Sequence, residues 1–163
     1  MKNHDMRQQL VQMGNGAHAL AIQMLGNADD ATDAVQDVFV KVLKRPDAYD
    51  ASSGPLTPWF LRVVRNHCID LIRRRRPVDA DVAELSDPRL GPEGLLENTQ
   101  FDQALQQALA KLSTLQREII VLRDYMDLSY AEIAITLEIA PGTVMSRLHR
   151  ARLALREELV SHG

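Results

Sequence analysis

The residues with the clearest chemical potential are arginines near the C-terminus, set among short polar side chains. Arginine can grip guanine or phosphate, and a helix with arginines on its exposed N-terminal half is suited to the DNA major groove. An ordinary solvated basic face has the same composition, so the residues alone leave both interpretations open. The candidate DNA-reading residues are Met145, Ser146, Arg147, His149 and Arg150, with Arg152 and Arg156 further along the same face.

A second basic cluster lies between residues 62 and 76, where six arginines face a single acid, Asp70. Four consecutive arginines could merely complement a helix dipole. With further basic and polar residues before them, we favour a surface that follows nucleic-acid phosphates. Tyr49 and Trp59 could stack on an unpaired base, although a lone tryptophan opening an amphipathic helix is as often part of a core. The set is Arg62, Arg65, Asn66, Arg73, Arg74, Arg75 and Arg76.

Bond-breaking chemistry is not expected. The sequence holds no paired carboxylate cluster, no metal-ligand spacing and no nucleophile with a base, and its five histidines are scattered. The single cysteine, Cys68, excludes an internal disulfide and a cysteine-based zinc site. The chain is therefore predicted to bind rather than catalyse, with no metal and no cofactor.

The C-terminal arginines need a helix to position them. Ser129 and Glu132 have the spacing of a capping box, and apolar residues then recur with helical period. The pattern breaks at residues 138–140, and Pro141 suits the first turn of a second helix. The sequence thus predicts a helix-turn-helix. Its buried residues are Tyr130, Ile133, Ala134 and Leu137 in the first helix, and Val144, Leu148, Ala151 and Leu155 in the second.

Helical periodicity also dominates the rest of the chain, and no strand is predicted. Residues 29–45 form an amphipathic helix with acids in its first turns and bases in its last, which suits the helix dipole. Alternatively, its Asp33, Gln36 and Asp37 form an exposed patch for a basic partner. Thr57 is the predicted cap of the next helix, which runs to residue 76, and Ser113 with Gln116 forms another capping box.

Charge and turn-forming residues divide the chain into two domains. The net charge of −3 conceals a segment 62–76 of net charge +5 beside a segment 77–100 of net charge −5. The second segment holds three prolines and two glycines without sustained period, so it is a predicted flexible linker. No membrane-span or signal pattern occurs, which predicts a cytoplasmic protein. The fold is predicted to be all-α, with small helical domains at 1–76 and 101–163.

Three stretches together resemble the extracytoplasmic-function (ECF, group IV) branch of the sigma-70 family of bacterial RNA polymerase sigma factors. They are DATDAVQDVFVKVLK, TPWFLRVVRNHCIDLIRRRR and LSTLQREIIVLRDYMDLSYAEIAITLEIAPGTVMSRLHRARLAL, in that order, with the acidic linker between the last two. The resemblance covers nearly the whole chain after about residue 20. It implies sigma region 2 in the first domain and region 4 in the second.

The resemblance also implies a role for each set of residues. Asp33, Gln36 and Asp37 match the patch that docks on the β′ clamp helices of core RNA polymerase, which the family contacts together with the β subunit. The loop 49–56 matches the one that captures a flipped minus-ten base, with Tyr49 as the stacking candidate. The arginines and asparagine of residues 62–76 match the minus-ten helix, and residues 145–150 match the minus-35 helix.

Further partners and departures follow from the same resemblance. An anti-sigma factor is implied as an inhibitor, and the linker matches the segment that threads the RNA exit channel. Glu138 stands where the family usually has glycine, and Met145 where it usually has lysine or arginine. The rival hypothesis is an autonomous helix-turn-helix regulator that binds duplex DNA without polymerase, as a dimer on two half-sites.

Overall fold

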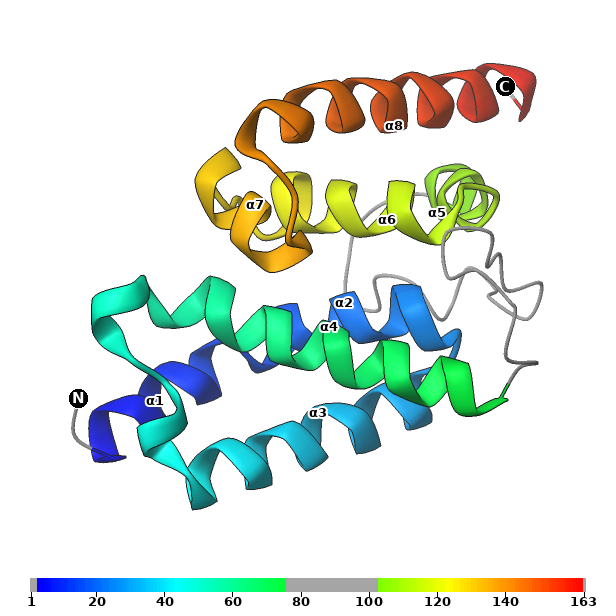
Figure 1. Ribbon diagram of the computed structural model, residues 1–163. Helices are drawn as coiled ribbons and strands as arrows, with labels where there is room; N and C mark the ends of the chain where they lie inside the picture. The colour runs from blue at the N-terminus through cyan, green and yellow to red at the C-terminus, as the bar shows by residue number, and fades with distance from the viewer. Residues whose placement is uncertain (1–2, 76–102, 163) are drawn as a thin grey trace.

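The computed structural model describes residues 3–75 and 103–162, which form two layers of helices (Figure 1). No strand occurs within these ranges, so the predicted all-α fold with two helical regions is confirmed. The predicted linker at 77–100 lies outside the described residues. The first layer contains α1 (Asn3–Gln12), α2 (Gly14–Leu25), α3 (Ala28–Lys44) and α4 (Leu56–Arg75). The second contains α5 (Gln103–Ala110), α6 (Thr114–Ile120), the π-helical turn η5 (Val121–Tyr125), α7 (Tyr130–Leu137) and α8 (Pro141–His162).

Helix α3 begins where its sequence provides an N-cap. The Asn27 side chain accepts a hydrogen bond of 2.7 Å from the Asp30 backbone N–H, which satisfies one of the free donors of the first turn. Acids occupy that turn, and Lys41 and Lys44 occupy the last, so both ends complement the helix dipole. The predicted apolar face packs inward. Its fully buried members are Ala31, Ala34, Val35, Val38 and Val42.

Helix α2 is the centre of the first layer, packed against both α3 and α4. It is separated from α1 at Met13, and Gly14 to Gly16 form its first turn. It ends at Gly26, whose φ of 87° closes the helix in a left-handed cap that glycine adopts without strain. Helix α4 begins at Leu56, one residue before Thr57, so the predicted cap residue lies inside the helix.

The apolar side of α4 completes this core. Phe60, Val64 and Cys68 are fully buried, and the Phe60 ring lies 5.2 Å from that of Phe39 on α3, centroid to centroid. Burial raises the pKa of the Cys68 thiol to about 12, and the nearby Glu118 carboxylate acts in the same direction. Cys68 is thus a small apolar core residue.

Both predicted capping boxes of the second layer are present. Ser113 and Gln116 exchange hydrogen bonds of 3.2 Å at the start of α6, and Ser129 and Glu132 do so at the start of α7. Helix α6 continues directly into the wider π-helical turn η5. A π-helical turn inserts an extra residue into the hydrogen-bond ladder and is common at functional sites.

The turn of the helix-turn-helix contains a strained residue. Glu138 caps α7 with φ 57° and ψ 47°, the left-handed conformation in which a side chain is unfavourable. Removing this strain with Glu138→Gly contributes about 1 kcal/mol. Glycine also raises the entropy of the unfolded chain, so we expect a net stabilisation somewhat below about 1 kcal/mol. Urea unfolding followed by circular dichroism measures this change.

The matched control for this prediction is Ala131→Gly, at an exposed position in the first turn of the same helix α7. Glycine introduced there is expected to destabilise the protein, by up to about 1 kcal/mol, because the backbone is helical and glycine loses more entropy on folding than alanine. Equal destabilisation by both substitutions would contradict a strained backbone at Glu138.

Candidate nucleic-acid interface

The helix-turn-helix consists of α7 and α8, joined at Glu138 to Ala140. Ile133, Ala134 and Leu137 of α7 are buried, as are Val144, Leu148 and Ala151 of α8. The predicted stripe residues Tyr130 and Leu155 are only half-buried. Packing of these two stripes fixes the side of α8 that faces solvent.

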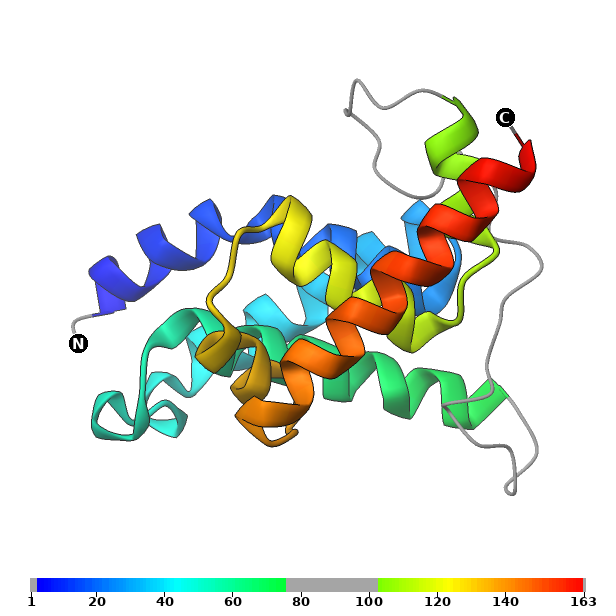
Figure 2. The same ribbon diagram turned by 90° about the horizontal axis from the view of Figure 1, so that it is seen from above.

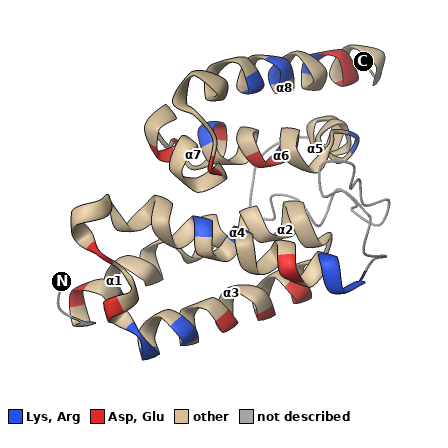
Figure 3. Ribbon diagram, viewed as in Figure 1, with Lys and Arg blue, Asp and Glu red and all other residues tan. Residues whose placement is uncertain are grey.

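The exposed side of α8 carries the predicted reading residues. Met145 is 62% exposed, and Ser146, His149 and Arg150 are also exposed. Arg147 is half-buried and lies close enough to Glu118 for its charge to lower that carboxyl's pKa, although burial outweighs this effect. Figure 3 shows the basic positions distributed along α8. This face is free to meet a groove of DNA.

Residues of η5 hold the helix-turn-helix in place, and the sequence did not single them out. Arg123 donates a 2.8 Å hydrogen bond to the Leu128 carbonyl, and its guanidinium lies 5.4 Å from the centroid of the Tyr130 ring. Arg152 of α8 forms a two-point ion pair with Asp124. The predicted outer-face residue Arg152 is therefore engaged within the protein.

The acidic patch on α3 is exposed along one face. Asp33, Gln36 and Asp37 recur at i, i+3 and i+4, and all three are exposed. One carboxylate oxygen of Asp37 lies 3.5 Å from Nε2 of His67 on α4. The patch thus presents two carboxylates and an amide on a rigid helix, which suits a basic partner surface.

The loop after α3 folds into two short 3₁₀ turns, η1 (Pro46–Ala48) and η2 (Ala51–Ser53). Tyr49 lies between them, only 9% exposed, and donates a 2.6 Å hydrogen bond to the Gly54 carbonyl. Its ring lies 5.1 Å from that of the half-buried Trp59, centroid to centroid. The two aromatic residues considered for base stacking therefore lie in contact, with their rings tilted by 48° to each other.

The basic residues of α4 fall into three environments. Asn66, Arg73, Arg74 and Arg75 are exposed, and Arg75 forms a 2.9 Å ion pair with Asp30. Arg62 is half-buried, whereas Arg65 is only 8% exposed. Arg76 lies outside the described residues. The structure thus brings most of this set to the surface and buries one member.

Arg65 is buried because it meets a charged pair that the sequence did not indicate. Its Nε donates a 3.2 Å hydrogen bond to Oε2 of Glu118, a fully buried residue of α6. Burial raises the pKa of the Glu118 carboxyl, against the opposing effect of the Arg65 guanidinium. Next to it, Arg117 is also fully buried and donates to the backbone carbonyls of Leu112 and Gln23. The signal in the sequence was that both charges fall directly before the apolar Ile119 and Ile120, in the α6 segment TLQREII.

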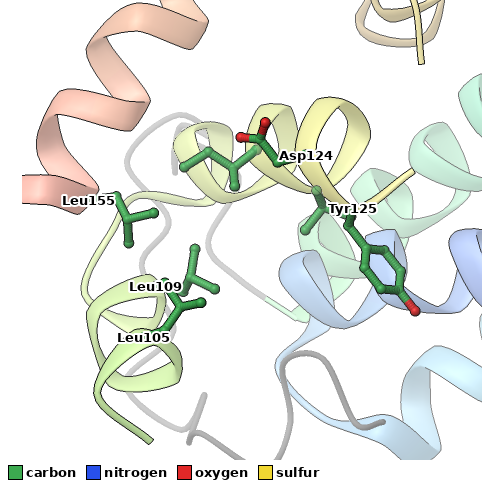
Figure 4. A pocket seen from close by; sticks show the side chains of 7 residues that line it. Leu105, Leu109, Asp124, Tyr125 and Leu155 are labelled. Atoms are coloured by element: carbon green, nitrogen blue, oxygen red, sulfur yellow. The ribbon is translucent and has the colours of Figure 1, made fainter. Parts of the chain in front are cut away.

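A mostly apolar pocket of about 170 Å³ lies between α5, the end of α6, η5 and α8. Figure 4 shows Leu105 and Leu109 of α5 near Leu155 of α8, whereas the ring of Tyr125 points away from them. Among the described residues, no group of three or more His, Cys, Asp or Glu side chains could hold a metal ion. No helix within that part of the chain is long and apolar enough to cross a bilayer.

Comparisons with known proteins agree with this geometry. The family Sigma-70 region 2 matches residues 10–78, and the family Sigma-70, region 4 matches residues 102–155. The ECF RNA polymerase sigma factor SigW of Bacillus subtilis is 32% identical over 154 residues, covering 87% of this chain and 82% of SigW. SigE of Mycolicibacterium smegmatis is 35% identical over 159 residues, which cover 93% of this chain but only 60% of SigE.

Two solved structures share the arrangement of nearly the whole chain. The sigma factor RpoE of Bartonella quintana, in complex with the anti-sigma factor NepR, has a TM-score of 0.73 and 29% identity, covering 95% of this chain and 96% of RpoE. CnrH, in complex with the cytosolic domain of CnrY, has a TM-score of 0.70 and 26% identity, covering 99% and 92% of the two chains.

The two helical layers and the exposed α8 face define a two-region sigma-70 protein, a class of transcription initiation factors. More narrowly, the chain belongs to the extracytoplasmic-function family of RNA polymerase sigma factors. It is an alternative sigma factor, which recognises promoters together with RNA polymerase.

Proposed function

We propose that this sigma factor divides its work between three segments. Residues 1–76 form region 2, residues 77–100 an acidic linker, and residues 101–163 region 4. The family matches at 10–78 and 102–155 support these boundaries. In this proposal, the chain binds and positions while the polymerase performs the chemistry, so the chain is not itself an enzyme.

Asp33, Gln36 and Asp37 dock on the β′ clamp helices of core RNA polymerase in this proposal, and the chain also contacts the β subunit. Their shared exposure on one face of α3 supports the docking role. Carboxylates at a protein interface steer encounter with a basic surface and fix its register. Since RNA polymerase works there, the site of action is the cytoplasm.

Region 2 then melts and holds the minus-ten element. The exposed Asn66, Arg73, Arg74 and Arg75 favour contact with the DNA backbone, and we assign the same role to Arg62, Arg65 and Arg76. Tyr49 stacks on the flipped base. That role requires the Tyr49 ring to leave Trp59 and its hydroxyl to leave the Gly54 carbonyl.

Region 4 reads the minus-35 element through Met145, Ser146, Arg147, His149 and Arg150. The observation that carries the proposed function is this exposed face on a helix-turn-helix whose other face is buried. An anti-sigma factor is the proposed inhibitor. Both structural relatives described above were solved with such a protein or with a cytosolic partner domain, which supports this assignment.

Transcription by purified core RNA polymerase on a pooled promoter library, with and without this chain, tests the proposal. We expect initiation at fixed sites that depends on the chain, and the aligned start regions then give both promoter elements. Failure to bind core polymerase, together with a two-half-site footprint on DNA without polymerase, would instead establish the autonomous regulator.

One departure from the family predicts a gain of DNA contact. Met145 is 62% exposed on the reading face, where relatives usually have a basic residue. We expect Met145→Lys to add one phosphate contact. For holoenzyme binding to promoter duplex, the slope of log affinity against log salt concentration should then become steeper by about 0.9. The control is Val160→Lys, which adds the same charge at a 72% exposed position near the other end of α8. Equal steepening in both variants would show a general charge effect.

A further inference from the structure

The imidazole of His67 on α4 lies beside the exposed carboxylate of Asp37 on α3. The two helices pack against each other and are joined at one end by the loop that contains η1 and η2 (Figures 1 and 2). The side chain of His67 is only 14% exposed, whereas that of Asp37 is 63% exposed. The pair therefore connects a largely buried group of α4 to the exposed patch on α3.

The ring nitrogen of His67 that faces Asp37 is buried. Within the described residues, Nε2 forms no hydrogen bond, and Oδ2 of Asp37 lies 3.5 Å from it. Buried polar atoms in folded proteins are almost always hydrogen-bonded. A rotation of the exposed Asp37 side chain that brings Oδ2 closer by about 0.5 Å gives an N–H···O bond of ordinary length. Asp37 is thus the acceptor that the structure offers to this nitrogen.

The contact determines which tautomer of the neutral imidazole is favourable. An ionised carboxylate only accepts hydrogen bonds, so an attractive contact requires the proton to be on Nε2. The other tautomer places the Nε2 lone pair against a carboxylate oxygen, which is repulsive. Neutral His67 therefore acts as a donor to Asp37, since the partner of a ring nitrogen fixes where the imidazole carries its proton.

Donation from His67 leaves Asp37 able to bind a second group. A carboxylate has about four acceptor positions on its two oxygens, and the imidazole uses one of them. The Asp37 side chain keeps most of its exposure beside His67, so a basic side chain of a partner can still reach it. The imidazole can therefore hold the carboxylate while the carboxylate binds a cation.

We propose that His67 is a positioning residue of the polymerase-docking patch, and that its Nε2–H holds the Asp37 carboxylate in the orientation that core RNA polymerase binds. The inference rests on the proposed function, which assigns Asp37 to the β′ clamp helices. A side chain that is ordered only on binding reduces the affinity by the entropy it loses. His67 lowers that loss by ordering the carboxylate in the free chain.

Two substitutions at position 67 separate hydrogen bonding from packing. Leucine fills a similar volume without a donor, whereas the amide of glutamine places an N–H near the position of Nε2. We expect His67→Leu to bind core polymerase about threefold more weakly than wild type. His67→Gln should restore the wild-type affinity, which a role in packing alone does not predict. Fluorescence anisotropy at pH 8 measures both, and circular dichroism melting confirms that each variant is folded.

The same comparison in an Asp37→Ala background is the matched control. Asp37→Ala removes the carboxylate that His67 orients, so it lowers the affinity by itself. In that background, His67→Leu is expected to cause no further loss, because the two residues act through one contact. An equal loss from His67→Leu in both backgrounds would show that His67 acts independently of Asp37, and would overturn the inference.

A measurement without polymerase tests the pair itself. Proton–nitrogen NMR of the histidine rings distinguishes the two tautomers, and the His67 signals are those that disappear in His67→Gln. We expect the proton of His67 on Nε2 in wild type, with a resonance further downfield than in Asp37→Ala, because a hydrogen bond to a carboxylate deshields it. A His67 ring that carries its proton on Nδ1 in wild type would contradict the proposed donor.

The outcomes separate this inference from the proposed function. If Asp37→Ala binds polymerase as tightly as wild type, the docking role of Asp37 fails, and the positioning role of His67 fails with it. If Asp37→Ala weakens binding but His67→Leu does not, the docking role stands and the inference about His67 alone is overturned.

Discussion

Replacing Asp37 by arginine is expected to abolish productive binding to core RNA polymerase. The carboxylate stands on the exposed face of α3 with Asp33 and Gln36, and charge reversal there places like charges against a basic docking surface. Loss of a charge pair that becomes buried on binding costs about 2–5 kcal/mol, or about 30-fold to several-thousand-fold in affinity. Fluorescence anisotropy of the labelled chain titrated with core polymerase measures it.

Asp37 is suited to this change because, within the described residues, the side chain at ion-pair distance from it is the imidazole of His67, at 3.5 Å. The fold therefore loses little when the carboxylate is removed. The matched control is Glu157→Arg, the same charge change at an exposed position of α8 in the other layer. Wild-type affinity of the Asp37→Arg variant would remove α3 from the polymerase interface, and equal losses in both variants would point to net charge.

Arg117→Ala is expected to be the most destabilising single substitution considered, at about 3–5 kcal/mol. Its side chain is fully buried, and its guanidinium donates to the backbone carbonyls of Leu112 and Gln23. Truncation leaves those acceptors without this donor and opens a cavity between α6 and α2. The melting temperature should fall by about 10 °C for a chain of this size.

The control for this loss is Arg156→Ala on the exposed side of α8. A surface arginine without a specific partner contributes within about 0.5 kcal/mol. If Arg117→Ala melts within 2 °C of wild type, as Arg156→Ala is expected to, the Arg117 network does not stabilise the fold.

The parts of the fold that local chemistry decides were predicted from the sequence. The caps at Ser113 and Ser129 and the proline at 141 act within one helical turn, so their spacing is enough to place helix ends. The apolar stripe of α3 is likewise visible as a 3.6-residue period. The left-handed conformation of Glu138 was suggested only by the resemblance to the family, which usually has glycine there. The glutamate itself gives no indication of a positive φ.

The parts that depend on the meeting of distant segments were not predicted. Arg65 has the spacing of a surface arginine, and its burial follows from Glu118, 53 residues away. The Tyr49 hydroxyl meets Gly54 because two 3₁₀ turns fold the loop back, which turn-forming residues do not specify. The π-helical turn at η5 was not predicted either, because it spans only five residues, too few to distinguish its period from that of an α-helix. The assignments of single residues to polymerase and DNA remain predictions.

The complete burial of Cys68 limits how oxidants can react with this sigma factor. Burial raises the pKa of this thiol to about 12, so it stays protonated at neutral pH, and the residue is fully buried. Thiolate is the form that peroxides and disulfides attack. In the folded chain, Cys68 therefore does not react with peroxides or disulfides, and the chain forms no disulfide with a second protein.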